Sequence, residues 1–195
     1  MAKDAIFASD EATEATDNEF KRITRTTVGS KEALDVAVKE GAPATPHGGS
    51  FVTWTVDASP DYSDGDQVGD VEEFDASLTE ADGTLTLESI ILIDDDKLNF
   101  DVDVLVFDSQ PTVTSSDNGA LAMTVANLQK CRARVRVREC DWSELDGQSI
   151  ADVTVGRPVK GANSDDSLYV ILQARGTINF VSTGGVSLAL NTLRD

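Results

Sequence analysis

Apolar and polar residues alternate in short runs along most of the chain, and a period of two is typical of half-buried β-strands. In residues 51–58, FVTWTVDA, the side chains of Val52, Trp54 and Val56 share one face. Clusters of turn residues separate such runs, and no long segment has the 3.6-residue period of a helix. The pattern therefore predicts an all-β chain.

About eight strands are expected, and they are listed here by residue range: 51–58, 67–78, 83–94, 97–108, 123–145, 150–160, 167–182 and 186–194. The acidic turn 94–96 separates the two strongest strands and predicts a hairpin. The segment 123–145 should bend near Asn127, after a short helical turn near Gly119–Ala122. This number of strands predicts an antiparallel β-sandwich or jelly roll.

The first 50 residues differ from the rest. Residues 1–20 are small, polar and acidic, and they predict an extended N-terminal arm that is either mobile or ordered by a partner. Residues 21–39 fit two short strands, or a strand followed by a helix at 31–39. Residues 40–50 are rich in Pro and Gly and predict a linker. The expected organisation is an arm and linker at 1–50 and a sandwich domain at 51–195, which is long enough to bury one core without a staple.

Charge narrows the choice of partners. The formal net charge is −19, from 16 basic and 35 acidic residues. A field of this sign repels nucleic acid and anionic membranes, so neither is an expected partner. No apolar run is long enough to span a membrane, and the N-terminus has no apolar signal-peptide core. Two explanations of the acidity stay open, which are adaptation to concentrated salt and docking onto a basic partner.

Several blocks resemble known proteins, and they occur in this order: LVFDSQPT (105–112), DNGAL (117–121), GRPVK (156–160), SLYVILQARGTINF (167–180) and LALNTLRD (188–195). They resemble a set of tailed-phage virion proteins that share a β-sandwich core and sit among head and structural proteins. The resemblance covers roughly 68–195 and implies a virion location. RTTVGSKEALDVAV (25–38) resembles an element near the N-termini of tail-associated virion proteins. The chain departs from the pattern in its acidity and in Arg157, where an apolar residue is expected.

One candidate binding surface lies in CRARVRVRE, residues 131–139. Strand alternation places four arginines on one face, Arg132, Arg134, Arg136 and Arg138. A guanidinium group pairs with a carboxylate bidentately, so this stripe could dock an acidic neighbour. Cross-strand pairing with Asp101 or Asp103 is the alternative.

Other candidate chemistry is weaker. The acidic loops 61–70 and 94–96 could bind Ca²⁺, although they lack EF-hand spacing, and no other cofactor is expected. His47 is the only histidine and lies in the Pro- and Gly-rich linker, so a Ser-His-Asp or Cys-His site is not expected. Trp54, Trp142 and Tyr169 fit core packing better than sugar stacking. Cys131 and Cys140 match no zinc pattern and are not expected to form a bridge.

These observations predict a non-enzymatic virion structural protein that decorates or cements the outside of a head. The expected partners are the major capsid protein and further copies of this chain, in a homo-oligomer. The alternatives are a tail or baseplate component, for which residues 25–38 are the support, and a host-binding adhesin or carbohydrate-binding domain. An adhesin predicts exposed aromatic residues gathered at one end of the domain.

The salt explanation of the acidity is testable. Screening by salt removes repulsion between carboxylates, so the melting temperature should rise steeply as NaCl enters the molar range. Thermal unfolding followed across an NaCl series measures this. A flat profile would discard salt adaptation and favour docking onto a basic partner.

Overall fold

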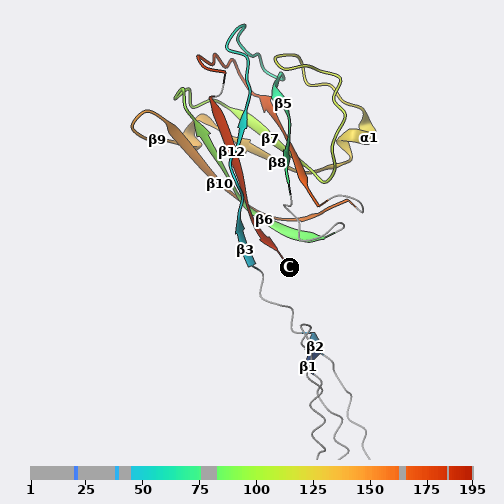
Figure 1. Ribbon diagram of the computed structural model, residues 1–195. Coiled ribbons are helices and arrows are strands. Elements are labelled where there is room, and N and C mark those ends of the chain that lie inside the picture. Colours follow the sequence, from blue (N-terminus) through green and yellow to red (C-terminus); the bar gives the residue numbers. More distant parts are fainter. Residues whose placement is uncertain are drawn as a thin grey trace, which may run out of the picture. The chain divides into compact units, whose positions relative to one another are not determined.

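A computed structural model describes residues 20–21, 38–39, 45–75, 83–162, 166–183 and 185–194 (Figure 1). The chain divides into two units between Pro43 and Ala44. In the first unit, β1 (Phe20–Lys21) pairs antiparallel with β2 (Val38–Lys39). The second unit contains the other strands and two short helices.

The strands of the second unit form two antiparallel sheets. The first contains β3 (Thr45–Gly48), β4 (Val52–Trp54), β6 (Thr84–Asp94), β9 (Trp142–Glu144), β10 (Ser149–Lys160) and β12 (Val186–Arg194). The second contains β5 (Gln67–Phe74), β7 (Val102–Phe107), β8 (Cys131–Val137) and β11 (Leu168–Ala174). A helical turn, α1 (Val125–Leu128), and a 3-10 turn, Glu139–Asp141, lie before and after β8.

The strand order is that of a jelly roll. The first sheet runs β3–β12–β6–β10–β9, with β4 also paired to β12, and the second runs β5–β11–β7–β8. The first strands thus pair with the last strand, β5 pairs with β11, β6 with β10, and the middle strands β7 and β8 with each other. This nested antiparallel pairing is a double Greek key, so the predicted sandwich or jelly roll is confirmed.

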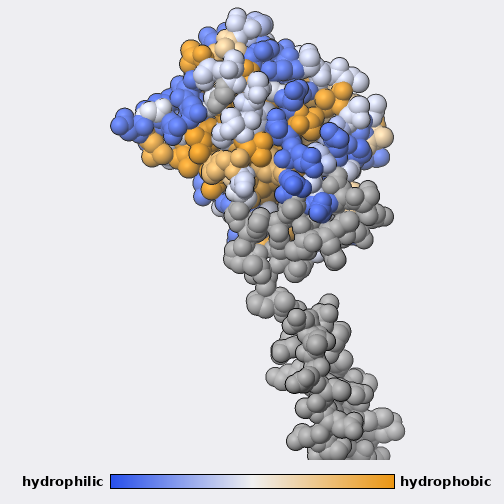
Figure 2. Space-filling view, viewed as in Figure 1, coloured by the Kyte–Doolittle hydropathy of each residue, from blue (hydrophilic) through white to orange (hydrophobic). Residues whose placement is uncertain are grey.

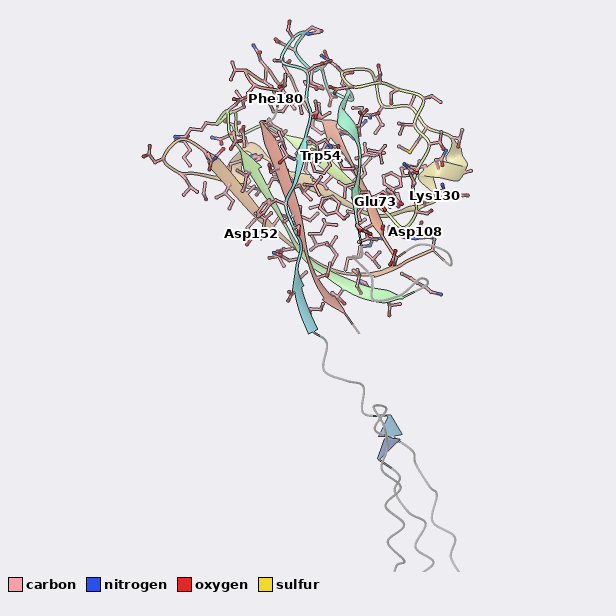
Figure 3. The ribbon with its side chains drawn as sticks, viewed as in Figure 1. Trp54, Glu73, Asp108, Lys130, Asp152 and Phe180 are labelled. Atoms are coloured by element: carbon pink, nitrogen blue, oxygen red, sulfur yellow. The ribbon has the colours of Figure 1, made fainter. Side chains whose placement is uncertain are left out.

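Alternation along each strand fills the space between the sheets. Trp54, Leu92, Val104, Leu172 and Leu188 are fully buried in one apolar core shared by both sheets. Figure 3 shows Trp54 between the sheets and Phe180 near one end. The core explains why the sandwich needs no metal or disulfide staple.

The predicted hairpin between residues 83–94 and 97–108 is wrong, because β6 and β7 lie in different sheets. The buried Asp94 carboxylate accepts hydrogen bonds from the backbone amides of Asp96, Leu98 and Asn99 at 3.0, 2.6 and 3.0 Å. Lys97 and Asn99 have positive φ angles of 56° and 50°. This corner sends the chain across the core instead of back along the same sheet.

The expected β segment at 123–145 does break near Asn127, as predicted, but it is also interrupted again after β8. Thr124 caps the helical turn α1, since its side-chain oxygen accepts a hydrogen bond from the Asn127 amide at 3.3 Å. The predicted helical turn near Gly119–Ala122 therefore falls a few residues too early. After β8, the 3-10 turn redirects the chain into β9 of the other sheet.

The N-terminal predictions are only partly covered. Thr45–Gly48 form β3, so a strand begins inside the stretch that was expected to be a linker. Residues 1–19, 22–37 and 40–44 lie outside the described residues, as does most of the 31–39 segment. The boundary at residue 50 stays a prediction. Among the helices described, none has the length and apolarity needed to cross a membrane.

Gly69 provides a test of how tightly the edge strand packs on the core. It lies at a bulge of β5, has φ of 64°, and an added Cβ would stand 2.6 Å from Trp54 Cδ1. Gly147 has φ of 92° but nothing within 4 Å of an added Cβ. Gly147→Ala should cost about 1–2 kcal/mol from backbone strain alone.

Gly69→Ala should cost more than Gly147→Ala, because Trp54 cannot move without disturbing the core. The free energy of unfolding in urea measures the difference. Equal losses in the two variants would show that the crowding at Trp54 relaxes without cost.

Candidate functional site

The outer face of the second sheet is covered by the chain itself. In β7, Val102, Val104 and Val106 point into the core, while Asp103, Leu105 and Phe107 point outward, and all six residues are buried. Leu105 and Phe107 form an outer apolar cluster with Tyr169 and Ile171 of β11. The segment 108–130 between β7 and β8 folds over this cluster, and its contacts come from Val113, Leu121 and Met123. The apolar half of the face is thereby covered.

Charged residues occupy the rest of that face. Asp103 is fully buried and lies opposite Arg136 of β8 and Gln173 of β11. Its carboxylate accepts hydrogen bonds from Arg134 Nε at 2.9 Å and Arg175 Nε at 2.5 Å, and it forms an ion pair with Arg136. Three guanidinium groups therefore share one buried carboxylate. Asp64 lies 3.8 Å from Arg175 Nη1 and is 72% exposed.

The arginines keep Asp103 ionised. Burial by itself would raise the pKa of this carboxyl group, but hydrogen bonds from Arg136, Arg175 and Arg134 lower its pKa below the ordinary value. A carboxyl group in an unfolded chain titrates at about 3.9. The cluster therefore stabilises the fold above that pH, and this stabilisation is lost as the pH falls through the lower folded-state value.

A second buried carboxylate, that of Asp108, lies where the segment 108–130 begins and ends. Asp108 is 3% exposed, and its side chain accepts a hydrogen bond from Arg132 Nε at 2.5 Å. The Asp108 amide donates to the Lys130 carbonyl at 3.1 Å, which closes the segment 108–130. Figure 3 shows Asp108 and Lys130 close together on the side of the sandwich that carries α1.

The arginines that pair with Asp103 and Asp108 belong to a basic band. The band follows β8 and the end of β10 and includes the residue after β11. Its members, seven of the 16 basic residues in the chain, are Lys130, Arg132, Arg134, Arg136, Arg157, Lys160 and Arg175. Three open hollows follow the band. One of about 760 Å³ is lined by Lys130, Arg132, Arg157 and Lys160 beside Asp108. One of about 300 Å³ is lined by Arg134, Arg136 and Arg157.

The third hollow, of about 430 Å³, has a different character. Its apolar wall is Leu105, Leu121, Met123 and Leu128, and Arg134 and Arg175 complete it. We call it the apolar hollow. Such a surface can hold an apolar side chain next to carboxylates, because guanidinium groups pair with carboxylates at its margin.

The four predicted arginines differ in their partners and in their exposure. Cross-strand pairing with Asp103, the alternative reading, is confirmed for Arg134 and Arg136. Asp101 instead accepts a hydrogen bond from the Glu139 amide at 2.7 Å. Arg138 follows the last residue of β8 and is exposed. Docking of an acidic neighbour stays a prediction, and Arg132 and Arg134 remain 45% and 55% exposed for it.

Four members of the band were not predicted, namely Lys130, Arg157, Lys160 and Arg175. Arg157 had one signal, since it stands where the resemblance expects an apolar residue. Arg175 continues the outward positions of β11 after Gln173, but only the pairing of β11 with β7 brings it to Asp103. Strand order, which the sequence does not contain, was the missing information.

The acidic loops use several of their carboxylates to hold backbone. Asp66 accepts from the Ser63 amide at 2.7 Å, and Asp96 accepts from the amides of Val181 and Ser182 at 2.9 and 3.1 Å. Within the described ranges, no three acidic, cysteine or histidine side chains gather as metal ligands do. Calcium at 61–70 or 94–96 therefore has only the acidity of these loops in its favour.

The remaining candidates lie apart from the band or have structural partners. Trp54, Trp142 and Tyr169 are buried, so their predicted role in packing is confirmed. Trp142 Nε1 donates to the Phe100 carbonyl at 2.9 Å. Cys131 and Cys140 are free thiols. The side chain of His47 lies outside the described residues.

Replacing Asp103 tests whether the cluster depends on its charge. Asp103→Asn keeps the shape of the side chain but leaves three arginines around a neutral amide. Breaking a buried pair in this way should lower the free energy of unfolding by about 3–5 kcal/mol. Urea unfolding at neutral pH measures the loss.

Asp152→Asn is the matched control, because Asp152 is exposed on β10, on the other sheet (Figure 3). It should change the free energy of unfolding by no more than about 0.5 kcal/mol. Similar small losses in both variants would show that the arginines do not need the Asp103 charge.

Comparison with known proteins does not identify a family for this chain. No protein-family model matches the chain, and no curated protein matches it in sequence. The chain is similar to a chain in the cryo-EM structure of Mud Crab Dicistrovirus, with 13% identity, a TM-score of 0.32, and coverage of 100% of this chain and 89% of that one. It is also similar to a chain of a full particle of Israeli acute paralysis virus, with 13% identity, a TM-score of 0.31, and coverage of 100% and 81%. At these TM-scores neither likeness bears on function.

Proposed function

We propose that the chain is a non-enzymatic virion structural protein that decorates or cements the outside of a head. Its partners are the major capsid protein and further copies of itself. The observation that carries the proposal is a jelly roll with a filled apolar interior, combined with a basic band on its surface. Jelly rolls serve as viral capsid domains, lectin domains and cupins, so the site must decide between these uses.

The interior argues against a cupin-type enzyme. Cupins hold their ligands inside the roll, whereas here the space between the sheets is occupied by aliphatic and aromatic side chains. Two open hollows, of about 760 and 300 Å³, instead lie on the outer surface and contain several basic residues in their lining. A surface of this kind binds a partner and does not enclose a substrate.

The aromatic residues argue against a sugar-binding domain. A lectin of this architecture needs exposed rings against which a sugar can stack. Trp54, Trp142, Tyr62 and Tyr169 are all buried, and Phe51, which is 48% exposed, is the one large ring exposed among the described residues. One exposed ring does not make a stacking surface.

Two outer surfaces suit protein neighbours. The basic band offers guanidinium and ammonium groups to carboxylates of a coat subunit. On the other sheet, Ile93 lies opposite Ile150, Ala189 lies opposite Ile91, and these isoleucines are half-buried. Figure 2 shows apolar colour over the face formed by β6, β10 and β12. Many copies that each use two such surfaces would gain avidity from modest contacts.

Copy number in purified particles tests the proposal. A decoration protein should be present in numbers comparable to the major coat protein, and quantitative mass spectrometry of particles measures this ratio. A few copies per particle would indicate the tail, baseplate or a vertex instead. Absence from particles would refute the virion role and return the adhesin alternative.

A further inference from the structure

One end of the first sheet carries an exposed apolar residue between carboxylates. The turn between β9 and β10, residues 145–148, is closed by a hydrogen bond from the Leu145 amide to the Gln148 carbonyl at 2.7 Å. Leu145 is 54% exposed, and Glu144 and Asp146 on either side of it are exposed. Figure 2 shows a hydrophilic projection at the left, where Figure 1 places β9.

The apolar hollow has the complementary character. Its wall is made of leucine and methionine side chains, and Leu128 at its margin is 53% exposed. Arg134 and Arg175 border it and belong to the cluster in which three guanidinium groups share the Asp103 carboxylate. The positive charge at this margin is held in place, because each of these arginines is fixed through its Nε atom.

We propose that the β9–β10 turn of one copy docks into the apolar hollow of a second copy. Leu145 enters the hollow, and Glu144 and Asp146 pair with Arg134 and Arg175. Burying a leucine side chain supplies the attraction, and the carboxylates fix the orientation and select this partner. Within the described part of the chain, the Glu144 side chain accepts one long hydrogen bond, from Asn99 at 3.4 Å, so it is available to exchange partners.

The contact must join different copies, because the two features lie on opposite sides of the domain. β9 is at the left edge of Figure 1 and α1, beside the hollow, is at the right edge. Such a head-to-tail contact uses two different patches, so it continues around a ring if the rotation closes. The inference deepens the proposed function by naming how copies meet on the head.

Self-association of the full chain is the first test, measured by sedimentation equilibrium. Leu145→Ser and Asp146→Lys should each weaken the association constant about tenfold or more. Leu145→Ser removes the apolar side chain that enters the hollow, and Asp146→Lys reverses the charge of a carboxylate that pairs with an arginine. Val181→Ser and Asp57→Lys are the matched controls, since both residues are exposed in loops outside the proposed surfaces. The controls should change the constant by less than about twofold.

A complementation experiment tests the head-to-tail geometry. Ala122→Phe fills the hollow from an exposed position, while Leu145→Ser leaves the hollow intact and removes the leucine side chain that would enter it. Neither variant should associate alone, but a mixture should form a one-to-one heterodimer, since the intact turn of one fits the intact hollow of the other. Thermal unfolding checks that both variants are folded.

A wild-type chain that stays monomeric at millimolar concentration would overturn the inference. So would equal weakening by Leu145→Ser and Val181→Ser, or a mixture that stays monomeric. These outcomes are separate from particle copy number, because the virion role can hold without this contact and the contact can form in solution without particles.

Discussion

The burial of β7 on both faces is the constraint on which the rest of the structure depends. Its inner face packs between the sheets and needs only apolar residues, which Val102, Val104 and Val106 provide. Its outer face would be open in a bare sandwich, and two different devices cover it. The segment 108–130 shields Leu105 and Phe107, while guanidinium groups from β8 and β11 surround Asp103. The two strands beside β7 in the sheet, β8 and β11, therefore help to cover its outer face as well as to form the core.

The distribution of charge on this protein depends on which charged side chains are buried as much as on how many acidic and basic residues there are. A chain with a net charge of −19 would repel acidic partners, yet seven basic residues gather along β8, at the end of β10 and directly after β11. Two buried carboxylates, Asp103 and Asp108, hold three and one of the arginines by hydrogen bonds. An arginine fixed in this way loses little conformational entropy when a carboxylate arrives, so the band is preorganised. The same side chains thus stabilise the sheet and offer a binding surface.

The jelly-roll topology distributes the binding surfaces over the domain. β8 and the end of β10 bring the basic band to one margin, whereas β9, at the edge of the first sheet, leads into an acidic turn with an exposed leucine. Surfaces of opposite character on opposite sides allow identical copies to join in series, and closed rings follow when the rotation is right. In this domain the space between the sheets is filled by apolar side chains, and this core holds the outer surfaces in place.

The sequence alone determined the fold class, since period-two alternation and turn residues specify strands. It also located β6, β10 and β12 within a residue or so, because their hydrophobic patterns are uninterrupted. The arginine stripe and its pairing with Asp103 were readable as alternatives from alternation. Strand order decided the rest. It separated β6 from β7, which local turn chemistry had paired, and it brought Arg175 to Asp103 from 72 residues away. Local pattern fixes which face a side chain occupies, but only long-range pairing fixes which neighbours it meets, because a period of two is the same for every strand.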